Sequence, residues 1–183
     1  MILPIVSYGD PVLRSKTKEI PEDFPGLSDL IDSMWETMYK ANGVGLAAPQ
    51  ISKSLRLFLV DTMSTYEDEE GSGIKKAFIN PEILSETGDK WGFEEGCLSI
   101  PKIREEVIRK EIVRIKYFDE HFKEFEETYD GMNARVIQHE YDHIEGILFT
   151  DHLKPLKKRL LRSKLDAISK GKIEIDYKMK FPK

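Results

Sequence analysis

The sequence predicts an α+β fold in which antiparallel strands pack around a central helix, with a further helix toward each end of the chain. Apolar residues recur at helical spacing in three separate stretches. Between these stretches lie short apolar or alternating runs typical of strands. The two kinds of segment do not interleave as βαβ units would, which favours α+β over α/β. A chain of 183 residues is long enough for one domain with a sizeable core, and we expect a single domain over residues 1–183.

The N-terminal 25 residues are predicted to form an extended, turn-rich arm, because they contain four prolines, each lacking an N–H and fixing φ. A helix follows. Its apolar stripe, at spacing i, i+3, i+4, i+7 and i+11, consists of Leu27, Leu30, Ile31, Met34 and Met38. Asn42-Gly43 is predicted to end this helix, since both residue types tolerate the left-handed conformation.

The middle of the chain is predicted to form strands. LRLFLVD (55–61) reads as a buried strand, and KAFINPEIL (76–84) as a second one closed by Asn80-Pro81. From residue 103 to 129, alternating apolar positions predict antiparallel strands with a turn near residues 119–121.

Two more helices are predicted in the last third of the chain. DGMNARVIQHEYDHIEG (130–146) has helical spacing, with Asp130 as N-cap and Gly146 just past the C-terminus. A basic amphipathic helix is predicted at about 155–169. Its expected inward face consists of Leu156, Leu160, Leu161, Leu165 and Ile168.

Composition excludes several classes of protein. The formal net charge of −5 gives no overall attraction to DNA or to an anionic membrane. A single cysteine cannot form an internal disulfide, so nothing indicates an oxidising compartment. No apolar run approaches the ~20 residues that span a bilayer, and the first residues do not resemble a signal peptide. We therefore expect a cytoplasmic protein without a DNA or membrane partner.

The predicted central helix carries the pattern H-E-x-x-H. His139 and His143 lie one turn apart along it and about 40° apart around its axis, so both imidazoles can reach one ion. Glu140 would border that ion without ligating it, as a general base does. Asp142 is placed to hold a ligand from outside the coordination shell. Because the pattern is short, two histidines on a helix by chance are the alternative.

The third ligand decides the class of site. Cys97, in EEGCLSIP, offers a thiolate, and a Cys-His-His set would leave a fourth position open, as catalytic sites do. The alternative for Cys97 is a small buried apolar residue. A downstream third ligand would instead indicate an endopeptidase of the H-E-x-x-H kind. The downstream candidates are Glu145, which is close along the same helix, His152 and Glu174.

Three motifs, GVGLAAPQ (43–50), EGCLS (95–99) and QHEYDH (138–143), together resemble the three signature motifs of the peptide deformylase family. The beginning YGDPVLR and the chain length are also similar, and the resemblance extends to about residue 165. The form EGCLS resembles the bacterial and organellar branch. The resemblance implies an enzyme that removes the N-formyl group from the formyl-methionine of newly synthesised polypeptides and releases formate.

The resemblance also implies a metal-dependent mechanism. The ligands of one divalent ion would be Cys97, His139 and His143, with Fe²⁺ as the natural ion and Zn²⁺, Ni²⁺ or Co²⁺ able to substitute. Glu140 would be the general acid/base for a metal-bound water. A water bound to such an ion has a pKa lowered toward ~7, so the implied nucleophile is available near neutral pH.

Further roles are implied for residues that would contact the substrate. The side chain of Gln50 and the backbone N–H of Leu98 would stabilise the oxyanion, and losing one such donor typically costs about 3 kcal/mol. Residues implied to line the substrate peptide are Val44, Gly45, Gly96 and Arg104. We also expect Val44 and Val136 to form part of an apolar pocket for the methionine side chain.

Two charged segments are not explained by these motifs. Residues 63–73 are acidic and contain Gly and Ser, so we interpret them as a solvated surface loop. From Lys154 to Lys172 there are eight Lys or Arg residues and one acid, Asp166. A solvated helix face explains this charge, and docking on ribosomal RNA is the alternative.

Two other classes stay open from the sequence. One is the endopeptidase, with a ligand other than Cys97. The other is a non-catalytic metal-binding or ribosome-associated module, against which the intact Glu140 and Gln50 argue, because a structural metal site needs neither.

Overall fold

The computed structural model describes residues 1–66 and 72–183. Its α-helices are α1 (Leu27–Lys40), α2 (Gly131–Ile144) and α3 (Pro155–Ser169). Its strands are β1 (Ile5–Val6), β2 (Gly45–Ala47), β3 (Leu57–Asp61), β4 (Lys75–Cys97), β5 (Ile100–Phe118), β6 (Glu124–Tyr129) and β7 (Met179–Lys180). Short 3₁₀ helices are η1 (Pro11–Arg14), η2 (Ala48–Ile51), η3 (Met63–Tyr66) and η4 (Phe149–His152).

The strands form an antiparallel sheet in the order β2-β3-β4-β5-β6, and β1 pairs with β7 in parallel. The predicted α+β class is confirmed. The predicted strand over 55–61 corresponds to β3, and the turn predicted near residues 119–121 joins β5 to β6.

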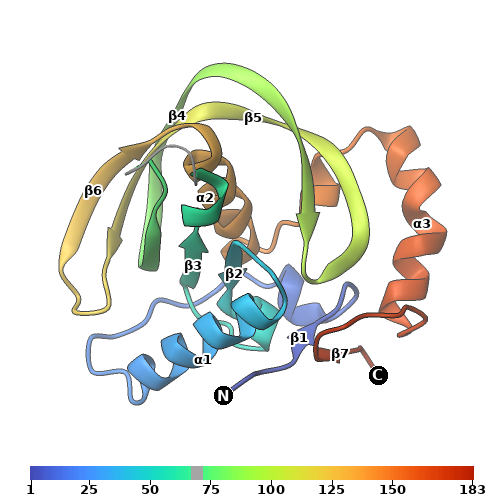
Figure 1. Cartoon of the computed structure of the whole chain (residues 1–183), viewed down its shortest axis with the longest axis horizontal. Helices are drawn as coiled ribbons and strands as arrows, with labels where there is room; N and C mark the ends of the chain where they lie inside the picture. The colour runs from blue at the N-terminus through green and yellow to red at the C-terminus, as the bar shows by residue number, and fades with distance from the viewer. Residues whose placement is uncertain (67–71) are drawn as a thin grey trace.

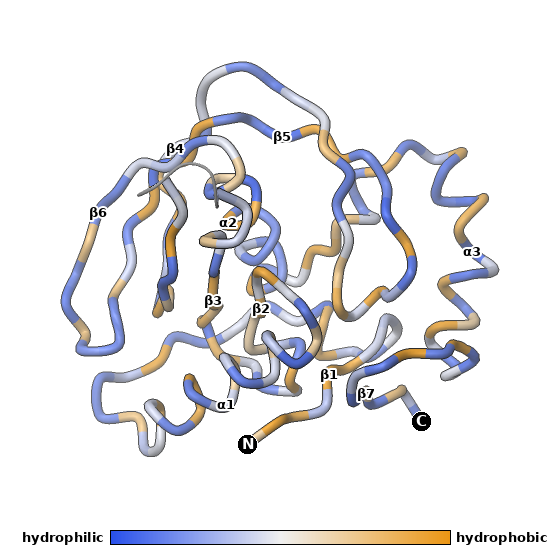
Figure 2. The backbone as a smooth tube through the Cα atoms, viewed as in Figure 1, coloured by the Kyte–Doolittle hydropathy of each residue, from blue (hydrophilic) through white to orange (hydrophobic). Residues whose placement is uncertain are grey.

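The hairpin of β4 and β5 dominates the architecture. Figure 1 shows it arching over α2, and Figure 2 shows that the top of the arch is hydrophilic. Its register shifts at four places, and such bulges bend a paired strand. The far end of the hairpin is a tight turn, because Cys97 pairs with Ile100 and only Leu98 and Ser99 lie between them. The bends bring this turn back toward α2.

The prediction that Asn80-Pro81 closes a strand was wrong, because β4 continues through it to Cys97. Asn80 has a φ of 48°, and the register shifts between Ile79 and Glu82, so the chain forms a bulge there instead of leaving the sheet. The Asn80 amide exchanges two hydrogen bonds of 2.8 Å with the backbone of Ile20. These bonds hold the bulge in place. From the sequence alone, only the turn-forming character of Asn80 and Pro81 is evident.

The central helix α2 is buried on more than one side, since six consecutive residues, 133–138, are buried. Its polar side chains are accommodated by specific bonds. Gln138, for example, donates to the carbonyls of Lys110 and Ala134, each at 3.0 Å. Gly146 follows the helix with a φ of 77°, as predicted, and Asp130 occupies the N-cap position, where its carbonyl accepts from Ala134. Because buried polar groups such as the Gln138 amide are hydrogen-bonded, α2 can carry functional side chains into the interior.

Helix α1 is as predicted: its apolar stripe packs on the sheet, and Asn42 beyond it is left-handed, with a φ of 55°. Helix α3 spans the predicted residues, but its expected inward face was partly wrong. Leu156 and Leu160 are 65% and 66% exposed, whereas Leu161, Leu165 and Ile168 are buried. At about 100° per residue, the first two lie outside the stripe that the other three define. Figure 2 shows hydrophobic and hydrophilic residues alternating along α3.

Part of the acidic segment predicted as a loop, residues 67–71, lies outside the described residues. Of the remainder, Met63–Tyr66 form η3. Among the described residues, no helix has the length and apolar character needed to cross a membrane.

The corrected face of α3 gives a matched pair of variants. Leu161→Ala should lower the free energy of unfolding by about 2–5 kcal/mol, because it removes a buried side chain and leaves a cavity. Leu160→Ala should change it by less than about 0.5 kcal/mol, because that side chain is already in water. Urea unfolding of both variants measures the difference, and equal losses would contradict this assignment of the two faces.

Candidate metal centre

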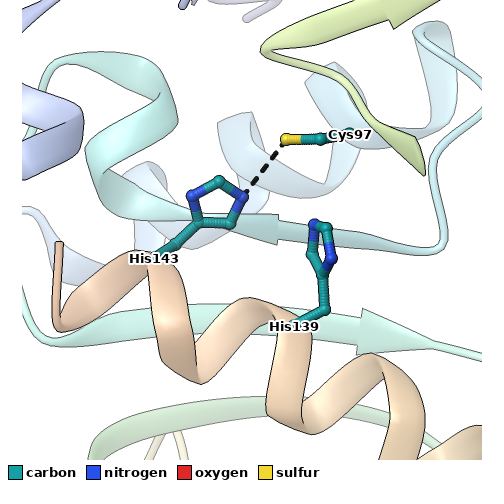
Figure 3. A group of neighbouring side chains, drawn as sticks. All are labelled: Cys97, His139 and His143. Carbon is teal, nitrogen blue, oxygen red and sulfur yellow. Dashed lines mark hydrogen bonds between the residues drawn. The ribbon is translucent and has the colours of Figure 1, made fainter. Parts of the chain in front are cut away.

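The predicted ligands converge at one place. Cys97 ends β4 at the turn of the long hairpin, while His139 and His143 lie one turn apart on α2 (Figure 3). One potential ligand atom from each residue lies within 4.8 Å of the others, and Cys97 Sγ is 3.3 Å from His143 Nε2. Ligands of one tetrahedral ion lie roughly 3–4 Å apart when metal–ligand bonds are about 2.0–2.3 Å. Cys97 and His143 meet this spacing, and the other pairs lie within 4.8 Å, so the three side chains are near enough to share one divalent ion.

The downstream candidates for a third ligand do not join this cluster. Glu145 pairs with Arg56 and Lys16, and His152 bonds to Asp142 at 2.8 Å. Within residues 1–66 and 72–183, the metal-competent group at this place is Cys97, His139 and His143 alone.

His139 is oriented by Glu95. Its Nδ1 donates to Glu95 Oε1 at 2.9 Å, which leaves Nε2 free to face the cluster. The expectation that Asp142 would hold a ligand was wrong, because its Oδ2 accepts from Arg109 at 2.9 Å and from His152. Glu95 has that place instead. A carboxylate that accepts from a metal-binding histidine fixes the orientation of the imidazole ring and raises the basicity of the ring.

Glu95 is itself the centre of a buried group of charges and is only 4% exposed. Arg109 donates to both of its oxygens, at 2.7 and 3.0 Å, and Arg135 donates to Oε2 at 2.8 Å. Burial alone would raise the pKa of Glu95, but hydrogen bonds from His139 and Arg109 outweigh it and hold this pKa well below its ordinary value. Glu95 therefore stays ionised, as the acceptor for His139 must be.

This group of charges was not predicted from the sequence, although one signal pointed to it. Residues i and i+2 of a strand share a face, so Glu95 and Cys97 belong on the same side of β4. The two arginines gave no such signal. Arg109 comes from β5 and Arg135 from α2, and only the fold shows that they meet.

Glu140 is also buried, at 4% exposed, but it is not neutralised in the same way. Its Oε1 lies 4.0 Å from His139 Nε2, and its Oε2 has no hydrogen-bond partner among the described residues. Burial raises the pKa of Glu140 to about 7. A carboxyl group with such a pKa can take and return a proton near neutral pH. The structure therefore lacks the solvent-exposed Glu140 that a non-catalytic module would allow.

The two histidines differ in their proton affinity. Burial and the neighbouring His139 lower the pKa of His143 well below its usual value, so this ring is neutral, the form that binds metal. Burial also disfavours a charged His139, but hydrogen bonds with Cys97 and Glu95 raise the pKa of His139 well above its usual value. A cation binding at Nε2 would displace that proton.

The glycines of GVGLAAPQ are required by close contacts. A Cβ added to Gly45 would lie 2.4 Å from Glu140 Oε1, and one added to Gly43 would lie 2.7 Å from Leu98 Cδ1. The main chain at Gly45 therefore lies directly against Glu140, and the main chain at Gly43 lies against the hairpin turn.

Gln50 faces the same turn with a fixed orientation. Its Oε1 accepts from Ala47 N at 2.9 Å, so its Nε2 is the group directed toward Cys97 Sγ, at 3.6 Å, and Ser99 Oγ, at 3.2 Å. Gln50 is buried, unlike an ordinary surface amide. A fixed N–H₂ group beside a ligand sulfur is a ready hydrogen-bond donor for a reacting group.

A cavity of about 830 Å³ opens onto these residues. Glu140, His139, Cys97, Gln50 and Leu98 all line it. The residues expected from the resemblance to line a peptide also surround it, and these are Val44, Gly45, Gly96 and Arg104, together with Val136. Every predicted site residue except His143 thus lines this cavity, and His143 is buried beside Cys97 in the same cluster.

Comparison with known proteins identifies similar chains. Residues 2–159 match the family model described as polypeptide deformylase. A peptide deformylase of Christiangramia forsetii is 56% identical over 190 aligned positions, covering 100% of this chain and 97% of the relative. One from Cytophaga hutchinsonii is 54% identical, covering 100% and 98%. The crystal structure of a peptide deformylase from Legionella pneumophila has a TM-score of 0.82 and 42% identity, covering 94% of this chain and 98% of that one.

The Glu95 group generates a prediction. Glu95→Gln should weaken binding of a divalent metal about 10- to 100-fold, because an amide orients His139 less firmly than a carboxylate does. It should also destabilise the fold by about 3–5 kcal/mol, because it removes the anion between two buried arginines. Chelator competition and urea unfolding measure these two effects.

The matched control is Glu94→Gln, one residue away on the exposed face of β4. It should leave both metal affinity and stability unchanged. Equal metal affinity in the two variants would show that Glu95 does not orient His139.

Proposed function

The chain belongs to the peptide deformylase family, and from that membership we propose how its own residues perform the reaction. It is an enzyme that removes the N-formyl group from nascent polypeptides in a metal-dependent hydrolysis. The observation that carries the assignment of residues is the meeting of Cys97, His139 and His143 beside a buried Glu140.

Cys97, His139 and His143 are the proposed ligands of one divalent ion. When bound, such an ion supplies a nucleophile from water near neutral pH and polarises the formyl carbonyl. Thiolate and imidazole ligands suit Fe²⁺, Zn²⁺, Ni²⁺ and Co²⁺ alike. We assign Fe²⁺ as the ion in the cell because of the family resemblance, with the other three as substitutes.

Glu140 is the proposed general acid/base. Its carboxylate takes a proton from the attacking water and returns it to the leaving amine nitrogen, so that formate and a free N-terminus result. Three features support this role: burial, the unpartnered Oε2 and the pKa of about 7.

Gln50 and Leu98 are the proposed oxyanion donors. Gln50 Nε2 is directed into the site by the bond that Ala47 N donates to Gln50 Oε1. The backbone N–H of Leu98 belongs to the residue directly after the ligand Cys97 and lies in the turn that lines the cavity. Donors fixed before the reaction stabilise the developing charge without reorganisation.

The substrate peptide is proposed to lie along the cavity between Val44, Gly45, Gly96 and Arg104. Val44 and Val136 are the apolar residues proposed to contact the methionine side chain. Glycine at 45 permits this approach, because a side chain there would collide with Glu140.

The rival functions have less support. An endopeptidase needs a ligand other than Cys97. The downstream candidates Glu145 and His152 are engaged elsewhere, and Glu174 is not in the metal-competent group. A purely structural metal site would need neither the buried Glu140 nor the oriented Gln50.

We also propose that residues 1–183 act as one domain in the cytoplasm and that α3 docks on ribosomal RNA. Several basic residues on α3 are exposed, and Lys158, Arg159 and Arg162 line a groove of about 600 Å³ together with Arg14. Asp166 and Asp151, which pairs with Arg14 at 2.6 Å, also line it, so that positive charge is in excess. A basic groove favours the phosphate backbone of RNA, and a ribosome-bound enzyme would meet its nascent substrate early.

Glu140→Gln tests the central role. The wild type, purified without oxygen and loaded with Ni²⁺ or Fe²⁺, should release formate from formyl-Met-Ala-Ser. Glu140→Gln should lower kcat by at least about 100-fold with the metal content unchanged, because the amide cannot carry the proton. The control, Glu106→Gln, changes an exposed glutamate of β5 and should match the wild type. Absence of formate from folded, metal-loaded wild type would contradict the proposed function.

Charge reversal on α3 tests docking. Lys158→Glu combined with Lys164→Glu should reduce co-sedimentation with ribosomes, and binding by the wild type should weaken as salt rises. Lys40→Glu combined with Lys53→Glu makes the same change in net charge on a different part of the surface and should have little effect. Equal loss in the two double variants would show that net charge, and not α3, governs binding.

A further inference from the structure

The C-terminal segment after α3 is a structural part of the site. The family match ends at residue 159, yet the chain continues for 24 residues and returns across the molecule. Figure 1 shows the red segment leaving α3 and passing beneath the end of the β4–β5 hairpin toward β1. There β7 pairs in parallel with β1, joining Ile5 to Met179 and Val6 to Lys180. Both ends of the segment are therefore anchored.

Between these anchors, residues 174–177 line the same cavity as Glu140 and His139. Side-chain exposure alternates along this stretch: Glu174 and Asp176 are exposed, while Ile175 and Tyr177 are half-buried. Every second side chain of this stretch thus faces the body of the protein. One of them, Tyr177, packs against the core cluster that includes the buried face of α1.

Tyr177 makes one specific contact with the site. Its hydroxyl donates to the backbone carbonyl of Leu98 at 2.7 Å. Leu98 packs against the same core cluster as the tyrosine ring, so the bond is supported by apolar contacts on both sides. The bond joins residues 79 positions apart in the chain and fixes the residue that follows Cys97.

The hairpin turn is held from three directions. Tyr8 N donates to the carbonyl of Ser99 at 2.8 Å, Gln50 Nε2 donates to Ser99 Oγ at 3.2 Å, and Tyr177 donates to Leu98. The first two bonds hold Ser99, and the third holds the carbonyl of Leu98. The Leu98 carbonyl belongs to the peptide unit that joins Leu98 to Ser99, whereas the Leu98 N–H belongs to the preceding unit, and the Leu98 Cα connects the two. Among these three bonds, only the one from Tyr177 fixes the Leu98–Ser99 unit through the Leu98 carbonyl, and it thereby limits rotation about that Cα.

We propose that Tyr177 is a positioning residue for the reaction: by holding the Leu98 carbonyl, it limits rotation about the Leu98 Cα and so keeps the adjoining Leu98 N–H in the orientation that stabilises the oxyanion. The inference rests on the proposed role of that N–H. It makes the C-terminal segment, which follows the residues matched by the family model, a contributor to transition-state stabilisation.

Tyr177→Phe tests the inference, because it keeps the ring and removes only the hydroxyl. We expect kcat on formyl-Met-Ala-Ser to fall about 3- to 10-fold with KM within about twofold, since the interaction lost acts mainly in the transition state. Metal content should stay that of the wild type, and the melting temperature should fall by no more than a few degrees, since one hydrogen bond is lost. The matched control is Tyr39→Phe, which also removes one hydroxyl bond, to Asp61 Oδ2 at 2.6 Å, away from the cavity.

A second readout does not depend on turnover. In the zinc-loaded protein, the ¹H–¹⁵N resonance of Leu98 should shift in Tyr177→Phe and stay in place in Tyr39→Phe. An unchanged kcat, a rise in KM alone, or an equal fall of kcat in both variants would each overturn the inference. If the wild type released no formate, the proposed function would fail, and an unmoved Leu98 resonance would then overturn the positioning of Leu98 separately.

Discussion

The buried carboxylate of Glu95 is the interaction on which the rest of the site depends. It accepts hydrogen bonds from Arg109 of β5, from Arg135 of α2 and from the ring of His139. A buried charge is tolerated only when it is paired and fully bonded, so these three elements cannot separate without a large cost in free energy. The same contacts that join the arch to the central helix therefore set the orientation of His139, one of the three proposed metal ligands.

The long hairpin supplies the other half of the geometry. Its bulges bend β4 and β5 over α2, and its two-residue turn presents Cys97 opposite His139 and His143. Glycines 43 and 45 let a second backbone segment approach, so that Glu140 and Leu98 are enclosed by main chain instead of by side chains. The groups proposed to take part in the reaction thus come from three parts of the chain.

Much of this could be predicted from the sequence, and the reasons are local. Helical spacing indicated α1, α2 and α3, and H-E-x-x-H predicted that two histidines lie one turn apart on α2. The errors concern tertiary structure. Asn80-Pro81 resembled a strand end because the amide contacts with Ile20 cannot be read from local sequence. Leu160 was predicted to face the core because it is apolar. The residue type alone does not show whether a neighbouring element covers the side chain. Glu95, Arg109 and Tyr177 were missed because their partners are distant in sequence.

X-ray absorption at the metal edge of the zinc-loaded protein tests the central claim most directly. A centre built from Cys97, His139 and His143 should show one sulfur at about 2.3 Å and two nitrogens at about 2.0–2.1 Å, and Cys97→Ser should lose the sulfur. A wild-type spectrum with only nitrogen and oxygen neighbours would show that the thiolate is not a ligand and would contradict the assignment of the site.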